Sequence, residues 1–82
     1  MERDRGVWCV DVASACQLMG RGRTMVWHYM KQRKLGWHRY GSHTLIFLED
    51  IADMLGQDED ALIDRLSALG LPLWRCWKET MI

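Results

Sequence analysis

A tight glycine-containing turn between two short amphipathic segments constrains the fold of this chain more than any other feature. Asp11 is placed to accept a hydrogen bond from a free amide at the start of the first segment. The residues that follow at helical spacing form one apolar stripe: Val12, Ala15, Cys16 and Met19. Gly20 then suits the end of this helix, because glycine adopts the left-handed conformation at little cost.

The second segment follows after only about two residues, begins between residues 21 and 24, and runs to about residue 32. Its apolar residues at helical spacing should face the first helix: Val26, Tyr29 and Met30. Arg23, Trp27 and Lys31 are four residues apart, so they should stack along one exposed ridge. Two short helices joined by so tight a turn form a helix-turn-helix.

The rest of the chain predicts a hairpin and two further helices. Residues 35–40 and 44–48 are rich in β-branched and aromatic residues and flank Gly41-Ser42-His43, which is typical of a hairpin with a short loop. Acidic residues favour the first turn of a third helix at 49–50 and of a fourth at 58–60, with Gly56 and Gly70 at their ends. Both helices should bury apolar side chains: Ile51, Met54 and Leu55, then Leu62, Ile63, Leu66 and Leu69.

These elements predict a mainly α fold with a small β-hairpin, preceded by the short apolar run Val7-Trp8-Cys9-Val10. Residues 1–56 hold the helix-turn-helix and the hairpin. Residues 57–82 hold the fourth helix and an apolar tail, rich in Trp and Leu, that either packs on the domain or mediates self-association into a homodimer or cooperative oligomer.

The charges are strongly segregated although the chain is neutral overall. Residues 21–34 hold five Lys/Arg and one His with no acidic residue. Residues 1–48 carry eight Lys/Arg against three Asp/Glu, and residues 49–82 carry three against eight. This asymmetry indicates a basic face for a polyanion, and the alternative is that the two halves simply attract each other within the fold.

Several classes of protein find no support in the sequence. The three cysteines lie far apart without a CxxC pair, and Cys9, His28, His38 and His43 match no recurring ligand spacing, so we expect no disulfide framework, metal or cofactor. Neither a nucleophile–base pair nor a glycine-rich phosphate loop points to an enzyme. No apolar run approaches the ~18 residues that cross a bilayer, and the first residues lack the apolar core of a signal peptide. We therefore expect a cytoplasmic protein without a membrane partner.

The order of helix, turn, basic helix, hairpin and helix carries a family resemblance over residues 8–55. Ten residues fall in register without a gap: Ala15, Leu18, Gly20, Thr24, Val26, Leu35, Ile46, Asp50, Ile51 and Leu55. This stretch resembles the winged helix-turn-helix DNA-binding domain of the MerR-like and phage excisionase-like families. It departs from their pattern at Arg21, where an aliphatic residue usually plugs the turn, and at Arg33, where a glycine usually ends the second helix.

The resemblance implies a sequence-specific double-stranded DNA-binding protein in a bacterium or phage-infected host, acting in transcription regulation or DNA recombination. The second helix would enter the major groove, and the hairpin would be a wing on the backbone or in the minor groove. Within that frame, the outward residues near the start of the helix are candidates for reading bases: Arg23, Thr24, Trp27 and His28. The remaining candidates, which contact phosphates or lie on the turn and wing, are Arg21, Lys31, Arg33, Lys34, Arg39, Ser42 and His43.

Three alternatives remain open. The DNA-recognition domain of a phage terminase small subunit looks similar over the same elements. A protein-interaction module could retain the same scaffold and dock through its tryptophan-rich surface. For Trp27, packing inside the domain competes with an exposed position against the sugar-phosphate chain.

Overall fold

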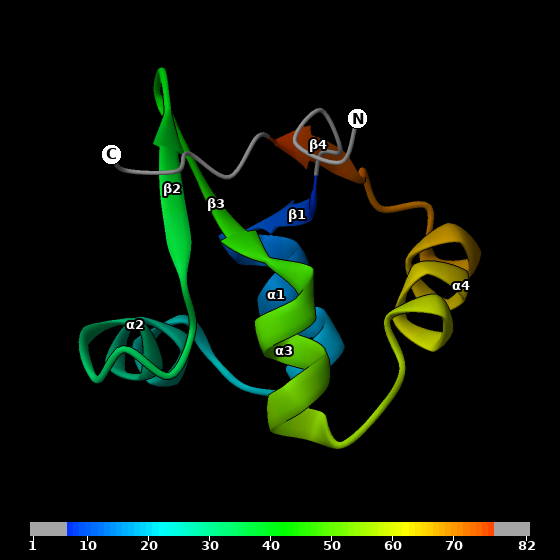
Figure 1. The fold of residues 1–82 in the computed structure, drawn as a ribbon, viewed down its shortest axis with the longest axis horizontal. Helices are drawn as coiled ribbons and strands as arrows, with labels where there is room; N and C mark the ends of the chain where they lie inside the picture. The colour runs from blue at the N-terminus through cyan, green and yellow to red at the C-terminus, as the bar shows by residue number, and fades with distance from the viewer. Residues whose placement is uncertain (1–6, 77–82) are drawn as a thin grey trace, which may run out of the picture.

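A four-stranded antiparallel sheet organises the protein, for which a computed structural model describes residues 7–76. The strands are β1 (Val7–Asp11), β2 (Trp37–Tyr40), β3 (His43–Phe47) and β4 (Trp74–Cys76). Their spatial order is β2-β3-β1-β4, so the first strand of the chain lies inside the sheet and the last lies at its edge. The β2–β3 hairpin extends beyond the other strands (Figure 1).

Within residues 7–76, four helices accompany the sheet: α1 (Val12–Met19), α2 (Arg23–Lys31), α3 (Leu48–Leu55) and α4 (Glu59–Leu69). Helix α1 is central, because it contacts each of the other three helices as well as β1 and β3. In Figure 1 the sheet crosses the upper part of the view, with α1 and α3 below it and α2 and α4 on opposite sides of them. This arrangement leaves one side of α2 without a neighbouring helix.

Alternation along the strands divides the apolar side chains between the two faces of the sheet. Val10 and Ile46, which are paired across β1 and β3, are buried in the main core with side chains of all four helices. Cys9 and Leu45 belong to a second, smaller cluster that includes Val7, Phe47 and Trp74. Successive residues of a strand point to opposite faces, so this second cluster lies on the face away from the main core.

The expectation of a mainly α fold with a small hairpin understates the β-structure. The hairpin is half of a four-stranded sheet, and the fold is mixed α/β. The apolar run at residues 7–10 forms β1, and part of the tail returns to pair with it as β4. Both strands are short, and their partners lie far away in the sequence, so no local pattern indicated the pairing.

Several local predictions are confirmed. Asp11 caps α1 and accepts a hydrogen bond from the backbone N–H of Ser14 at 2.8 Å. Gly20, Gly56 and Gly70 end their helices in the left-handed conformation. The predicted β2–β3 hairpin forms, although His43, expected in the loop at 41–43, is the first residue of β3, and Leu48, expected in the second strand, begins α3.

Other assignments within the core are confirmed only in part. On α1, the predicted stripe residues Cys16 and Met19 pack against the main core but are only half-buried, whereas Leu18 and Ser14, which the stripe did not include, are buried. On α4, Leu69 is 49% exposed instead of buried. The predicted tail residues beyond 76, Trp77, Met81 and Ile82, lie outside the described residues. Among residues 7–76, no helix is long and apolar enough to cross a membrane.

Candidate nucleic-acid interface

The turn between α1 and α2 fixes which face of α2 is buried. Gly20 takes a left-handed conformation with φ 66°, which allows the backbone N–H of Arg21 to donate to the Cys16 carbonyl at 3.1 Å. The chain then enters α2, whose Val26 and Met30 are buried against the core. These two side chains lie one turn apart on the same face, so the opposite face of α2 is left open to solvent.

All eleven side chains that the sequence analysis predicts to bind DNA are exposed. They are Arg21, Arg23, Thr24, Trp27, His28, Lys31, Arg33, Lys34, Arg39, Ser42 and His43. For Trp27, whose placement stayed open in the sequence, the structure gives an exposed fraction of 40%. The packed alternative for this tryptophan is therefore wrong.

The open side of α2 carries charge that the rest of the described chain does not neutralise. Between residues 12 and 48 there are six Lys/Arg and no Asp/Glu. Within residues 7–76, Lys31, Arg33 and Lys34 enter neither an ion pair nor a side-chain hydrogen bond. An uncommitted cation keeps its full attraction for an anionic ligand, so these three residues are available to phosphates.

Arg23 has a further neighbour on α1. Burial raises the pKa of the Cys16 thiol, and the positive charge of Arg23 partly opposes that rise. Arg23 is the first residue of α2 and follows the turn directly.

Like the other three helices, α2 is followed by a residue in the left-handed conformation, but here that residue is not a glycine. The N–H of Arg33 donates to the Met30 carbonyl at 3.0 Å, and that of Lys34 donates to the Tyr29 carbonyl at 2.9 Å. This pair of bonds requires a left-handed residue, and Arg33 supplies it with φ 62°. Arg33 is the one non-glycine residue with positive φ among those that the structure describes. The chain thus keeps a strained cation where a glycine would be unstrained.

Gly36 fixes the base of the hairpin next to α2. Its N–H donates to Asp50 Oδ2 at 2.7 Å, and its carbonyl accepts from the N–H of Phe47 at 3.0 Å. A Cβ at this position would lie 2.7 Å from the same carboxylate oxygen and 2.8 Å from the Phe47 ring. Only glycine fits so close an approach, and the two bonds set the point from which β2 leaves α2.

The hairpin divides its candidate residues between two faces. Trp37 pairs with Ile46 and Arg39 with Thr44, so both point to the face that carries the main core. His43 points to the other face, where its ring lies 5.2 Å from the Trp74 ring. Arg39 therefore shares a face with the side chains next to α2, and His43 does not. Ser42 lies in the loop, at the end of the hairpin farthest from α2 (Figure 1).

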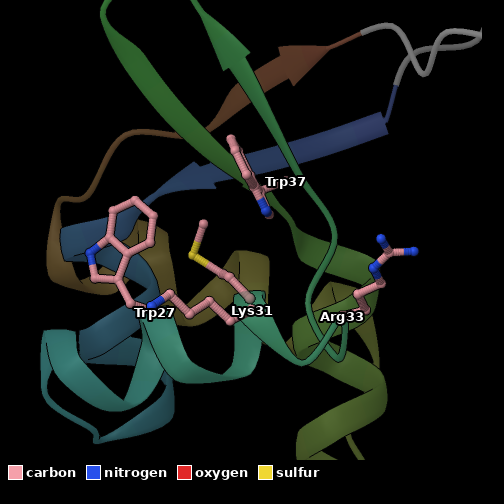
Figure 2. Close-up of a pocket in the computed structure, with 5 residues that line it drawn as sticks. Trp27, Lys31, Arg33 and Trp37 are labelled. Carbon is pink, nitrogen blue, oxygen red and sulfur yellow. The ribbon is translucent and has the colours of Figure 1, made fainter.

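A pocket of about 450 Å³ lies between α2 and β2, lined by Trp27, Met30, Lys31, Arg33 and Trp37. Figure 2 shows Trp27 rising from α2 with its ring seen face-on, and Trp37 beside the same space with its ring seen nearly edge-on. Lys31 lies along α2 in the direction of Trp27, whereas the guanidinium of Arg33 points away from that tryptophan. Trp37 is 44% exposed. The pocket combines two open aromatic faces with the stems of two cationic side chains.

The sequence analysis did not single out Trp37, which lines this pocket. The signal was present in the alternation of β2, because a residue two positions before Arg39 must share its face. What the sequence could not give was the approach of this face to Trp27, which depends on the contact between Gly36 and Asp50.

Other chemistry is sparse in the described part of the chain. Among residues 7–76, no group of three or more His, Cys, Asp or Glu side chains is placed to hold a metal ion. The exposed acidic side chains lie on or next to α3 and α4: Asp53, Asp58, Asp60 and Asp64. Arg65 of α4 donates from Nη1 to the Leu18 carbonyl at 2.9 Å, which ties α4 to the end of α1.

Comparison of the chain with models of known protein families, with curated proteins and with solved structures found no match.

Proposed function

We propose that this protein binds double-stranded DNA through the open face of α2, as a winged helix-turn-helix of the MerR-like or excisionase-like kind. The observation that carries the proposal is the set of exposed cations on and around α2, in a stretch from residue 12 to residue 48 that has no acidic side chain. Duplex DNA is a dense line of phosphates, and each Lys or Arg that neutralises one releases a counterion.

The dimensions of α2 support this use. With its side chains, an α-helix such as α2 is about 10–12 Å across. A B-DNA major groove is roughly 12 Å wide and admits a helix. With Val26 and Met30 buried in the core, the opposite face can enter the groove without disturbing the packing.

The residues of α2 then divide into two roles. Thr24 and His28 lie on the side of α2 opposite Val26 and Met30, and Arg23 is exposed at its first turn. These three residues are nearer the start of the helix than Lys31 and would meet base edges. Lys31, Arg33 and Lys34, at the end of α2, would meet phosphates and fix the register of the protein on the duplex. Arg39, on the hairpin face that adjoins α2, would contact the backbone beside the groove.

The salt dependence of binding tests this proposal. With six cations between residues 21 and 39 engaged, affinity for any duplex should fall about 1,000-fold between 50 and 200 mM salt, with a log–log slope of about −5. Lys31→Ala should make the slope shallower by about one unit. The matched control is Gln32→Ala, which shortens an exposed neighbouring side chain and removes no charge. Absence of duplex binding at low salt would overturn the proposal.

A second candidate function, docking to another protein, is favoured by the exposed apolar side chains. Trp27, Trp37 and Tyr40 are 40%, 44% and 50% exposed. Exposed aromatic residues of this kind are enriched at protein interfaces. Such an interface would bind with little dependence on salt, so the same titration with a protein partner separates the two candidates.

A further inference from the structure

Trp27 and Trp37 come from separate elements and face one pocket. Trp27 belongs to α2 and Trp37 to β2, yet both line the same space of about 450 Å³ (Figure 2). Each leaves about two-fifths of its surface open to water, although large aromatic side chains are normally covered. Two partly exposed indoles whose planes differ in Figure 2 indicate a flat ligand that stacks on one ring and is bordered by the other.

The charge at the pocket restricts the ligand further. Lys31 and Arg33 complete its lining, and neither is engaged in an ion pair within the described residues. The lining holds two cationic side chains and no acidic one, and this favours an anionic ligand over a cationic one. A flat ring attached to an anionic group fits both features, and a nucleobase with its phosphate is such a ligand. Ligand pockets of roughly 300–1,000 Å³ are common, so the volume suffices for one nucleotide.

A paired base in a duplex cannot be this ligand. Its two faces are covered by the neighbouring bases, and only its edges are accessible in the grooves. A base presents its face when it is unpaired, as in a bulge, a gap or a single-stranded end. The pocket adjoins the side of α2 that, under the proposed function, lies against duplex DNA.

The pocket is also fixed before any ligand arrives. Trp37 directly follows Gly36, whose N–H is held by Asp50 of α3, and it pairs with the buried Ile46 of β3. On the other side, Trp27 lies on a helix whose Val26 and Met30 are buried. A preformed site loses less entropy on binding than one that must be ordered.

We propose that the pocket between α2 and β2 binds one unpaired nucleobase of DNA, stacked on one of the two indoles of Trp27 and Trp37 and bordered by the other, with Lys31 or Arg33 near its phosphate. The protein thereby prefers DNA in which a duplex adjoins an unpaired base over fully paired DNA. This inference rests on the proposed function, since α2 holds the adjoining duplex.

The test compares four ligands at fixed salt: a paired duplex, the same duplex with one bulged 2-aminopurine, the corresponding single strand, and 2-aminopurine nucleotide alone. We expect the bulged duplex to bind about tenfold more tightly than the paired one, because stacking of one base on an aromatic side chain is worth roughly 5- to 150-fold in affinity. The fluorescence of the bulged 2-aminopurine should fall on binding, since the base stacks on indole.

Variants assign the effect to the pocket. Trp37→Ala should abolish the preference for the bulge and leave the affinity for paired duplex unchanged, and Trp37→Phe should restore part of the preference. The matched control is Tyr40→Ala, which removes an equally exposed aromatic from the same strand but from its opposite face. Circular dichroism and thermal unfolding check that each variant folds.

The failures are distinguishable. If the paired duplex binds with the expected salt slope and the bulge adds nothing, the pocket inference is wrong and the proposed function stands. If no DNA binds at low salt, the proposed function fails as well. Equal affinity for the free nucleotide and the bulged duplex would also overturn the inference, because the ligand would then be a soluble nucleotide. Loss of the preference in Tyr40→Ala as well as in Trp37→Ala would contradict the assignment to this pocket.

Discussion

Replacing Arg33 with glycine should stabilise the protein and make its DNA binding less dependent on salt concentration. The left-handed conformation, which Arg33 adopts with φ 62°, costs an L-residue roughly 1–2 kcal/mol. Glycine avoids this cost but loses roughly 0.5–1 kcal/mol through its greater freedom in the unfolded chain. The net gain is about 0.5–1 kcal/mol, and at about 4–8 °C per kcal/mol for a small domain the Tm should rise by roughly 2–8 °C.

The same chain provides the reverse experiment. Gly56 has φ +67°, and a Cβ there would meet no atom within 4 Å, so Gly56→Ala isolates the conformational cost and should lower the Tm by a similar amount. Arg33→Lys keeps both the charge and the strain, so its stability and DNA-binding slope should match those of the natural chain. Arg33→Gly should make the salt slope shallower by about one unit. A fall in Tm for Arg33→Gly, measured by calorimetry, would refute the reasoning.

Three further predictions follow from particular contacts. Gly36→Ala should destabilise the fold by about 1–3 kcal/mol in chemical denaturation, because the new Cβ would lie 2.7 Å from Asp50 Oδ2 and 2.8 Å from the Phe47 ring; an unchanged midpoint would show that this approach is not tight. Arg23→Ala should relax the sequence preference in a binding-site selection, whereas Lys31→Ala should weaken binding evenly across sequences, and identical behaviour of the two variants would contradict their separate roles. Asp11→Ala should lower the free energy of unfolding by about 1 kcal/mol, because it removes the side chain that accepts from the N–H of Ser14 at the start of α1. An unchanged Tm in thermal unfolding would contradict this role of Asp11.

The parts of the fold that the sequence predicted well are those decided by neighbouring residues. Asp11 could be identified as a cap because capping acts over three residues, and Gly20 as a helix end because the left-handed conformation is a property of one residue. The exposed ridge of Arg23, Trp27 and Lys31 follows from helical periodicity alone.

The parts that the sequence missed depend on contacts between distant segments. The pairing of β1 with both β3 and β4 joins residues that no local pattern connects, so the extent of the sheet was not predictable. Leu69 has an apolar side chain at helical spacing, yet it lies at the end of α4, where it remains half exposed. The pocket needs α2 and β2 to meet at an angle set by Gly36 and Asp50, fourteen residues apart.

At Arg33 the sequence departs from the pattern that the chain resembles, and the structure shows which backbone conformation this residue adopts. An arginine stands where the resembled pattern has glycine, and its backbone keeps the glycine conformation. The helix end is thus maintained by the packing and hydrogen bonds around it, at the expense of local strain. The charge that this residue contributes beside the α2 face is a functional reason for such strain under the proposed function.

The most direct test of DNA binding by α2 is a titration of the isotope-labelled protein with a short duplex, followed through its backbone amide NMR signals. The account predicts that the largest shift changes fall on α2, from Arg23 to Lys31, and on the hairpin near Arg39, while the amides of the acidic α4 stay unchanged. Shift changes concentrated on α3 and α4 with α2 unaffected, or no changes at low salt, would contradict it.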